Sequence, residues 1–245
     1  MRILAFDTAT PATTVALSGV DGIVFSARHD PVPGERPGHA THLLALVARV
    51  LERAGLEWGG VQRIAVGVGP GTFTGLRIGI ATARALAGAR EIPLVAISTL
   101  QSLALMRPRG ISTPAGLDSA PAGLDTVFAV LDARRGEVFA AGWRIDEAGQ
   151  FDSALLLPHA LSPDGLAELI LPLGPSTLAI GDGAVKFREA LERSGSFIPD
   201  DDSPLHRVTA TNHCRLAEQR SGSAPEEVRP DYLRAPDAEI AHRSR

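Results

Sequence analysis

Acidic residues at the ends of short apolar strands are the side chains of this sequence best placed to do chemistry. Asp7 ends the first apolar run, and Thr8 and Thr10 follow it in the sequence DTAT. A carboxylate and hydroxyls at a strand end can hold a metal-bound nucleotide phosphate, or they can simply satisfy the amides of a turn. We take Asp7, Thr8 and Thr10 as candidate nucleotide contacts, with the structural turn as the alternative.

A second acidic turn occurs halfway along the chain. Asp132 ends the apolar run TVFAVLD and begins the sequence DARRGE, so it is the counterpart of Asp7. Backbone amides approach phosphate oxygens most easily where the turn residues are small. Arg134 and Arg135 occupy this turn instead, so we expect it not to bind phosphate.

Residues 67–87, GVGPGTFTGLRIGIATARALA, combine a glycine-rich turn with a helix. They fit neither G-x-G-x-x-G nor a Walker loop, which needs a lysine that this stretch lacks. Gly75, Gly79 and Ala83 recur every four residues, although each glycine inside a helix costs about 1 kcal/mol relative to alanine. This stripe of small residues predicts close packing of another backbone, which belongs either to a partner or to the protein's own sheet or neighbouring helix.

The remaining reactive side chains do not assemble into a site. Cys214 is the only cysteine and has His213 merely as its sequence neighbour, which is poor geometry for a nucleophile and its base. His39 and His42 lie three residues apart, but no third ligand at metal-binding spacing accompanies them. We therefore predict no catalytic residue and no metal site.

Composition and charge limit the possible partners. The 245 residues are 44% hydrophobic, carry a formal net charge of -4 and contain a single lysine, Lys186. This balance argues against a protein that binds nucleic acid by itself. Neither a secretory leader nor a run of eighteen apolar residues is present, so we expect a cytoplasmic protein without membrane contact.

The order of predicted elements indicates a duplicated α/β fold. Strands at about 2–6, 13–18 and 22–28 precede a helix at 40–54, and strands and helices then alternate to give the order βββαβαβα. A similar but shorter series begins at residue 126. We predict a first lobe at 1–107, a flexible Pro/Gly/Ala-rich insertion at 108–125, a reduced second lobe at 126–210, and a helix and tail at 211–245 that pack back on the first lobe. Two lobes that each open with a three-stranded meander tipped by an acid resemble the actin, hexokinase and Hsp70 type of fold.

Four stretches give a closer resemblance. Residues 69–87, GPGTFTGLRIGIATARALA, resemble the signature of the TsaB family, the dimerisation subunits of the bacterial complex that makes threonylcarbamoyladenosine in tRNA. Residues 39–51 resemble the first helix of the family, LDARRGEVFAA resembles its second-lobe hairpin, and RPDYLR resembles its C-terminal signature.

The resemblance implies a subunit without catalytic residues of its own. In the family, the paralogue TsaD carries the metal and transfers the threonylcarbamoyl group, and the ATPase TsaE joins the complex. Where TsaD has metal-binding histidines, this chain has residues 98–102, STLQS. The resemblance therefore implies a heterodimer with TsaD, contact with tRNA only through the complex, no tightly bound cofactor, and ATP or ADP at most at the complex interface. A homodimer is an open possibility for the lone chain.

Pairing in the family uses helices of the first lobe, so we predict which residues form the interface. They are Leu43, Leu46, Gly75, Leu76, Gly79 and Ala83. The alternative function, of a different class, is an autonomous ATP-dependent phosphotransferase or a peptidase-like hydrolase of the same fold.

Overall fold

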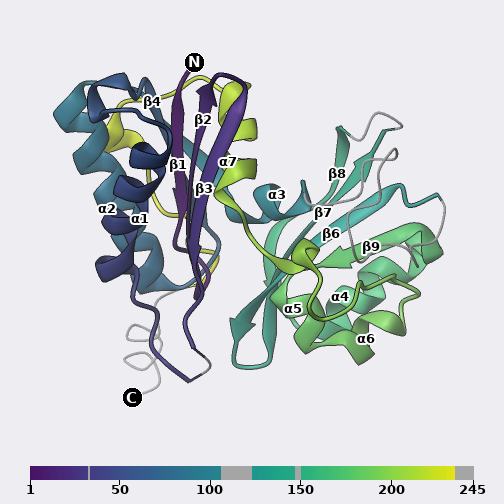
Figure 1. The fold of residues 1–245 in the computed structure, drawn as a ribbon. Helices are drawn as coiled ribbons and strands as arrows, with labels where there is room; N and C mark the ends of the chain where they lie inside the picture. Colours follow the sequence, from purple (N-terminus) through teal and green to yellow (C-terminus); the bar gives the residue numbers. More distant parts are fainter. Residues whose placement is uncertain (33, 106–122, 147–149, 235–245) are drawn as a thin grey trace. The chain divides into compact units, whose positions relative to one another are not determined.

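A computed structural model describes residues 1–32, 34–105, 123–146 and 150–234 (Figure 1). The chain divides into two compact units, one made of Met1–Ser102 and Val208–Arg245, the other of Leu103–Arg207. The predicted insertion at 108–125 lies outside the described residues up to residue 122. None of the helices in the described ranges is long and apolar enough to cross a membrane.

A five-stranded mixed sheet forms the centre of the first unit. Its strands in spatial order are β3 (Ile23–His29), β2 (Thr13–Val20), β1 (Ile3–Asp7), β4 (Arg63–Gly69) and β5 (Leu94–Ser98). The first three strands form an antiparallel meander, whereas β4 and β5 run parallel to β1. Parallel pairing requires crossover connections, and helices supply them here.

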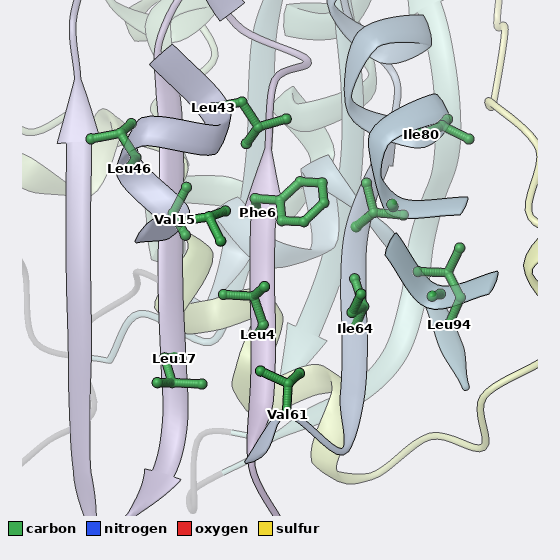
Figure 2. Packing of buried hydrophobic residues seen from close by; sticks show 14 of the residues in the cluster. Leu4, Phe6, Val15, Leu17, Leu43, Leu46, Val61, Ile64, Ile80 and Leu94 are labelled. Atoms are coloured by element: carbon green, nitrogen blue, oxygen red, sulfur yellow. The ribbon is translucent and has the colours of Figure 1, made fainter. Parts of the chain in front are cut away.

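Helices cover both faces of this sheet. Figure 1 shows α1 (His39–Arg53) and α2 (Phe73–Arg90) side by side on one face and α7 (Ala210–Glu218) on the other. A short helix, α3 (Thr99–Ala104), follows β5 directly. The apolar side chains of α1 and α2 pack on alternate residues of the strands, among them Leu4, Phe6, Val15 and Ile64 (Figure 2). Strands β1, β2 and β4 are buried on both faces, and alternate residues of each strand point into this core.

The second unit repeats this arrangement in shorter form. Its sheet has the order β8 (Phe151–Leu161), β7 (Glu137–Ile145), β6 (Thr126–Arg134) and β9 (Thr177–Ile180), with β9 parallel to β6. The helices are α4 (Pro163–Ile170), α5 (Asp182–Lys186) and α6 (Arg188–Glu192). Single turns of 3-10 helix lie at Trp58–Gly60, Leu171–Ser176, Pro204–His206 and Pro225–Glu227.

Comparison of the two sheets confirms the predicted fold class. In both, an antiparallel meander is followed by a strand that pairs parallel to its first strand. The counterpart of β5 is reduced, within the described residues, to a single parallel bridge between Leu178 and Phe197. One detail differs from the sequence prediction: the helix expected at about 184–193 is divided into α5 and α6, because the backbone at Phe187 leaves the helical region.

Candidate functional site

The carboxylate of Asp7, at the end of β1, is fully buried and has protein donors on both oxygens. Oδ1 accepts a hydrogen bond from the amide of Ala9 at 2.7 Å. Oδ2 accepts one from the hydroxyl of Thr99 at 2.8 Å and lies 2.9 Å from Nε2 of His213. The acid that the sequence offers for nucleotide binding is thus surrounded by donors of its own unit.

His213 extends the array from α7 toward α3. Its Nδ1 lies 2.8 Å from the hydroxyl of Ser102 and 3.1 Å from the carbonyl oxygen of Thr209. Ser102, His213 and Asp7 have no exposed surface. Strand β1 and helices α3 and α7, which are far apart in sequence, are therefore joined by one buried polar array.

The charge state of Asp7 follows from the opposing effects of burial and hydrogen bonding on its pKa. Burial raises the pKa of the Asp7 carboxyl, but the hydrogen bond and charge of His213, together with the donors Ala9 and Thr99, hold that pKa below its ordinary value of 3.8. Asp7 is consequently an ionised acceptor. Nε2 of His213 is therefore the donor of the hydrogen bond to Oδ2.

The absence of a side chain at Gly67 allows β4 to pass close to Asp7 and His213. A Cβ atom at this position would overlap Oδ2 of Asp7 and would lie 3.0 Å from Nε2 of His213. A residue larger than glycine would therefore displace the buried pair. Sequence reasoning missed Thr99, Ser102 and His213, which are distant in sequence; the glycine within an apolar strand was the available signal of a close approach.

The other two candidate nucleotide contacts differ in their surroundings. Thr8 is fully buried, and its hydroxyl donates to the carbonyl oxygen of Gly75 at 2.8 Å. Thr10 is half-buried. The polar groups of Asp7 and Thr8 hold the unit together through contacts with its own residues, which favours the structural turn, and their contact with a nucleotide stays a prediction. For Thr10, nucleotide contact stays a prediction.

The second acidic turn has the same internal arrangement. Oδ1 of Asp132 accepts from the amide of Arg134 at 2.9 Å, as Oδ1 of Asp7 accepts from the amide two residues on. Oδ2 of Asp132 accepts from Nζ of Lys186 at 2.9 Å, and Asp182 accepts from the amide of Asp132 at 3.0 Å. Carboxylates of the chain thus already occupy amides that a phosphate would need.

The predicted interface residues lie inside the first unit. Leu43, Leu46, Gly75, Leu76, Gly79 and Ala83 are all at most 8% exposed. A Cβ on Gly75 would overlap the carbonyl oxygen of Thr8, and one on Gly79 would overlap its hydroxyl. These six residues therefore pack inside their own unit, where Gly75 and Gly79 bring α2 close to Thr8, and their contact with a partner stays a prediction.

The opposite sides of α1 and α2 remain exposed in the described structure. Leu44 is 54% exposed, and four exposed alanines lie on the same two helices together with charged residues such as Arg49 and Arg77: Ala45, Ala48, Ala81 and Ala85. Because α1 and α2 lie side by side, these residues form one surface, which we call the outer face (Figure 1). Small side chains on neighbouring helices permit close approach of a further helix.

The histidines near the start of α1 have local roles. Nδ1 of His39 lies 2.8 Å from the hydroxyl of Thr13, and burial lowers the pKa of His39. The ring of His42 stacks on that of His29 at 3.6 Å between centroids. Across the described ranges, no three His, Cys, Asp or Glu side chains form a group that could hold a metal ion.

These features define the class of the protein: a duplicated α/β fold of the actin, hexokinase and Hsp70 type with a reduced second lobe. A family profile described as TsaD, tRNA N6-adenosine threonylcarbamoyltransferase, matches residues 35–201. The tRNA threonylcarbamoyladenosine biosynthesis protein TsaB of Escherichia coli is 32% identical over 96% of this chain and 95% of its own length. The chain belongs to the TsaB family.

Two further relatives agree with this assignment. A solved structure from Pseudomonas aeruginosa, described as a protein with similarity to peptidase YeaZ, superposes with a TM-score of 0.74 at 28% identity and covers 95% of this chain and 99% of that one. A tRNA N6-adenosine threonylcarbamoyltransferase of Brucella anthropi is 36% identical over 43% of this chain and 34% of its own length. The family resemblance and the fold class are confirmed.

Proposed function

We propose that this protein is a cytoplasmic, non-catalytic subunit of a complex that forms threonylcarbamoyladenosine in tRNA, and that it pairs with a TsaD-type paralogue through the outer face of α1 and α2. The paralogue supplies the metal and the transfer chemistry, a TsaE-type ATPase joins the larger complex, and tRNA contacts this chain only within it. The place for ATP or ADP in this proposal is the joint interface. The lone chain can form a homodimer through the same face.

The observation that carries the proposal is that the carboxylate of each acidic turn is already bonded by donors of its own unit. In an actin-like nucleotide site, such turns present open amides and a carboxylate to phosphate and metal. Here Asp7 is held by His213 and Thr99, and Asp132 is held by Lys186 and the amide of Arg134. Nucleotide binding would have to displace these partners, which is most costly at Asp7, where the pair is buried.

A hydrolase is the alternative that one specific observation favours. Ser102, His213 and Asp7 form a hydroxyl–imidazole–carboxylate series with distances of 2.8 and 2.9 Å. A catalytic series of this kind needs a serine oxygen that a substrate carbonyl can reach and donors for the oxyanion. Ser102 has no exposed surface, so the series supports a structural role rather than peptide hydrolysis.

Reconstitution with the TsaD-type protein of the same organism tests the proposal. We expect the two purified chains to co-elute from a sizing column, and transfer of the threonylcarbamoyl group to tRNA to require both chains together with the TsaE-type ATPase. The lone chain should neither hydrolyse ATP nor transfer the group.

Two controls make the result decisive. Asp7→Ala and Ser102→Ala should leave any trace hydrolysis in the lone preparation unchanged, because such activity would come from a contaminant. Turnover by the lone chain that disappears in either variant would overturn the proposal in favour of the autonomous enzyme, and failure of the wild-type chains to co-elute would overturn the pairing.

A further inference from the structure

An arginine in contact with two aromatic residues lies in the first turns of α2. The guanidinium carbon of Arg77 lies 3.7 Å from the centroid of the Phe73 ring, and Nε of Arg77 donates to the hydroxyl of Tyr232 at 3.2 Å. The rings of Phe73 and Tyr232 stack at 5.1 Å between centroids. We call these three residues the aromatic–arginine cluster.

The C-terminal segment fixes this cluster in place. The amide of Asp231 donates to the carbonyl oxygen of Val68 at 2.8 Å, which holds the segment at the end of β4. Val228, three residues earlier, is buried in the core of the first unit. Tyr232 therefore has a defined position, although its side chain is exposed.

The cluster leaves the outer end of Arg77 available. Its Nε is bonded and its plane lies over Phe73, whereas within the described residues neither Nη group has a hydrogen-bond acceptor. An arginine whose plane is already fixed loses less conformational freedom when it binds a carboxylate through two parallel hydrogen bonds. Exposed tyrosine and arginine held in this way are the residue types that dominate binding energy in protein interfaces.

We propose that the aromatic–arginine cluster is the charged end of the partner interface, where Arg77 binds an Asp or Glu carboxylate of the TsaD-type partner and Tyr232 acts as its positioning residue. This inference rests on the proposed function. Arg77 and Ala81 are four residues apart and both exposed on α2, so the cluster continues the outer face. The neighbouring surface combines Leu44 and several alanines with both a basic and an acidic side chain, Arg49 and Glu52, and this mixture suits a protein partner better than an RNA backbone.

Binding measurements with the TsaD-type partner test the inference through three variants. Arg77→Gln should raise the dissociation constant about tenfold or more, because an interfacial carboxylate would lose its charged partner. Arg77→Lys should weaken binding nearly as much, because an ammonium cannot form the two parallel bonds. Tyr232→Phe, which removes only the hydroxyl, should weaken binding about threefold and should add nothing in the Arg77→Gln background.

Two controls separate binding from folding. The melting temperature of each lone variant should stay within about 4 °C of wild type, because the cluster is exposed. Arg144→Gln, which removes an exposed arginine of the second unit paired with Asp125, should bind like wild type.

The remaining outcomes overturn the inference in distinguishable ways. If the wild type pairs and Arg77→Gln pairs equally well, the inference is wrong while the proposed function stands. If Arg77→Gln pairs normally but the assembled complex binds tRNA less tightly, Arg77 contacts an RNA phosphate instead. Failure of the wild type to pair removes both the proposed function and this inference.

Discussion

At the scale of single residues, the buried hydrogen bond between Asp7 and His213 has the largest expected effect. Removing one partner of a buried pair that contains a charge typically costs about 3–5 kcal/mol. Because the remaining donors on Asp7 are also buried, water cannot replace the lost partner readily. The pair is therefore a determinant of the stability of the first unit.

We expect the stabilisation by this pair to depend on pH in a defined direction. The pKa of Asp7 is lower in the folded protein than its ordinary value of 3.8, so the ionised carboxylate contributes fully above that value and its contribution disappears as the pH falls through the folded pKa. Asp7→Asn should lower the free energy of unfolding by about 3–5 kcal/mol near neutral pH. The difference from wild type should shrink below about pH 4. Urea unfolding across this range measures both quantities.

The matched control for this prediction is Asp152→Asn, which neutralises an exposed carboxylate on β8 and should change stability by less than about 0.5 kcal/mol. If the difference in free energy of unfolding between wild type and Asp7→Asn is equally large at both ends of the pH range, the prediction is contradicted. The loss of stability would then come from the shape of the side chain and not from its charge.

At the scale of elements, the glycines of α2 differ according to the face on which they lie. A Cβ on Gly75 would overlap the backbone of Thr8, which cannot move aside as a flexible side chain could. Gly75→Ala should therefore lower the free energy of unfolding by about 1–3 kcal/mol, as overpacking does in cores. A Cβ on Gly88 meets nothing within 4 Å, so Gly88→Ala should raise stability by up to about 1 kcal/mol. Thermal unfolding of the two variants, made in one helix, gives the comparison.

Equal destabilisation by both alanine substitutions would contradict this account, since it would mean that glycine is needed along the whole helix. The two variants also test the prediction that the small residues of α2 contact a partner. If Gly75 faced a partner, the lone chain would tolerate alanine at that position.

The same helix shows what the sequence could and could not predict. The strands, α1, α2 and the duplication follow from hydrophobic period and turn residues, which are local properties. The spacing of Gly75 and Gly79 correctly indicated a close backbone approach, but spacing alone does not identify the backbone that approaches. The contact of His213 with Asp7 spans 206 positions of sequence and has no local signal, so the buried array was missed.

At the scale of the whole molecule, the two related units pair their acidic turns in the same way but with different basic side chains. Asp7 and Asp132 occupy equivalent turns, and each carboxylate bonds the amide two residues on and a basic side chain from a later helix. His213 plays that part in one unit and Lys186 in the other. Because each unit neutralises its own acid, we expect specificity to lie on exposed surfaces.

The outer face can be separated from the core by a pair of variants in one helix. Ala81→Glu places a charge on the exposed side of α2, where the lone chain has room for it, so its melting temperature should match that of wild type. In the complex the same carboxylate would be buried without a partner, which should weaken pairing about a hundredfold. Gly79→Leu should do the reverse and lower the melting temperature of the lone chain, because its side chain would overlap Thr8.

Ala154→Glu, at an exposed position of β8 in the second unit, is the matched control and should leave both quantities unchanged. Calorimetry gives the melting temperature of each lone variant, and titration into the TsaD-type partner gives its affinity. Sedimentation shows whether Ala81→Glu also dissociates a homodimer of the lone chain. An Ala81→Glu protein that binds the partner as tightly as wild type would remove the outer face from the interface. Because the lone chain should stay folded, that result could be attributed to the surface and not to the core.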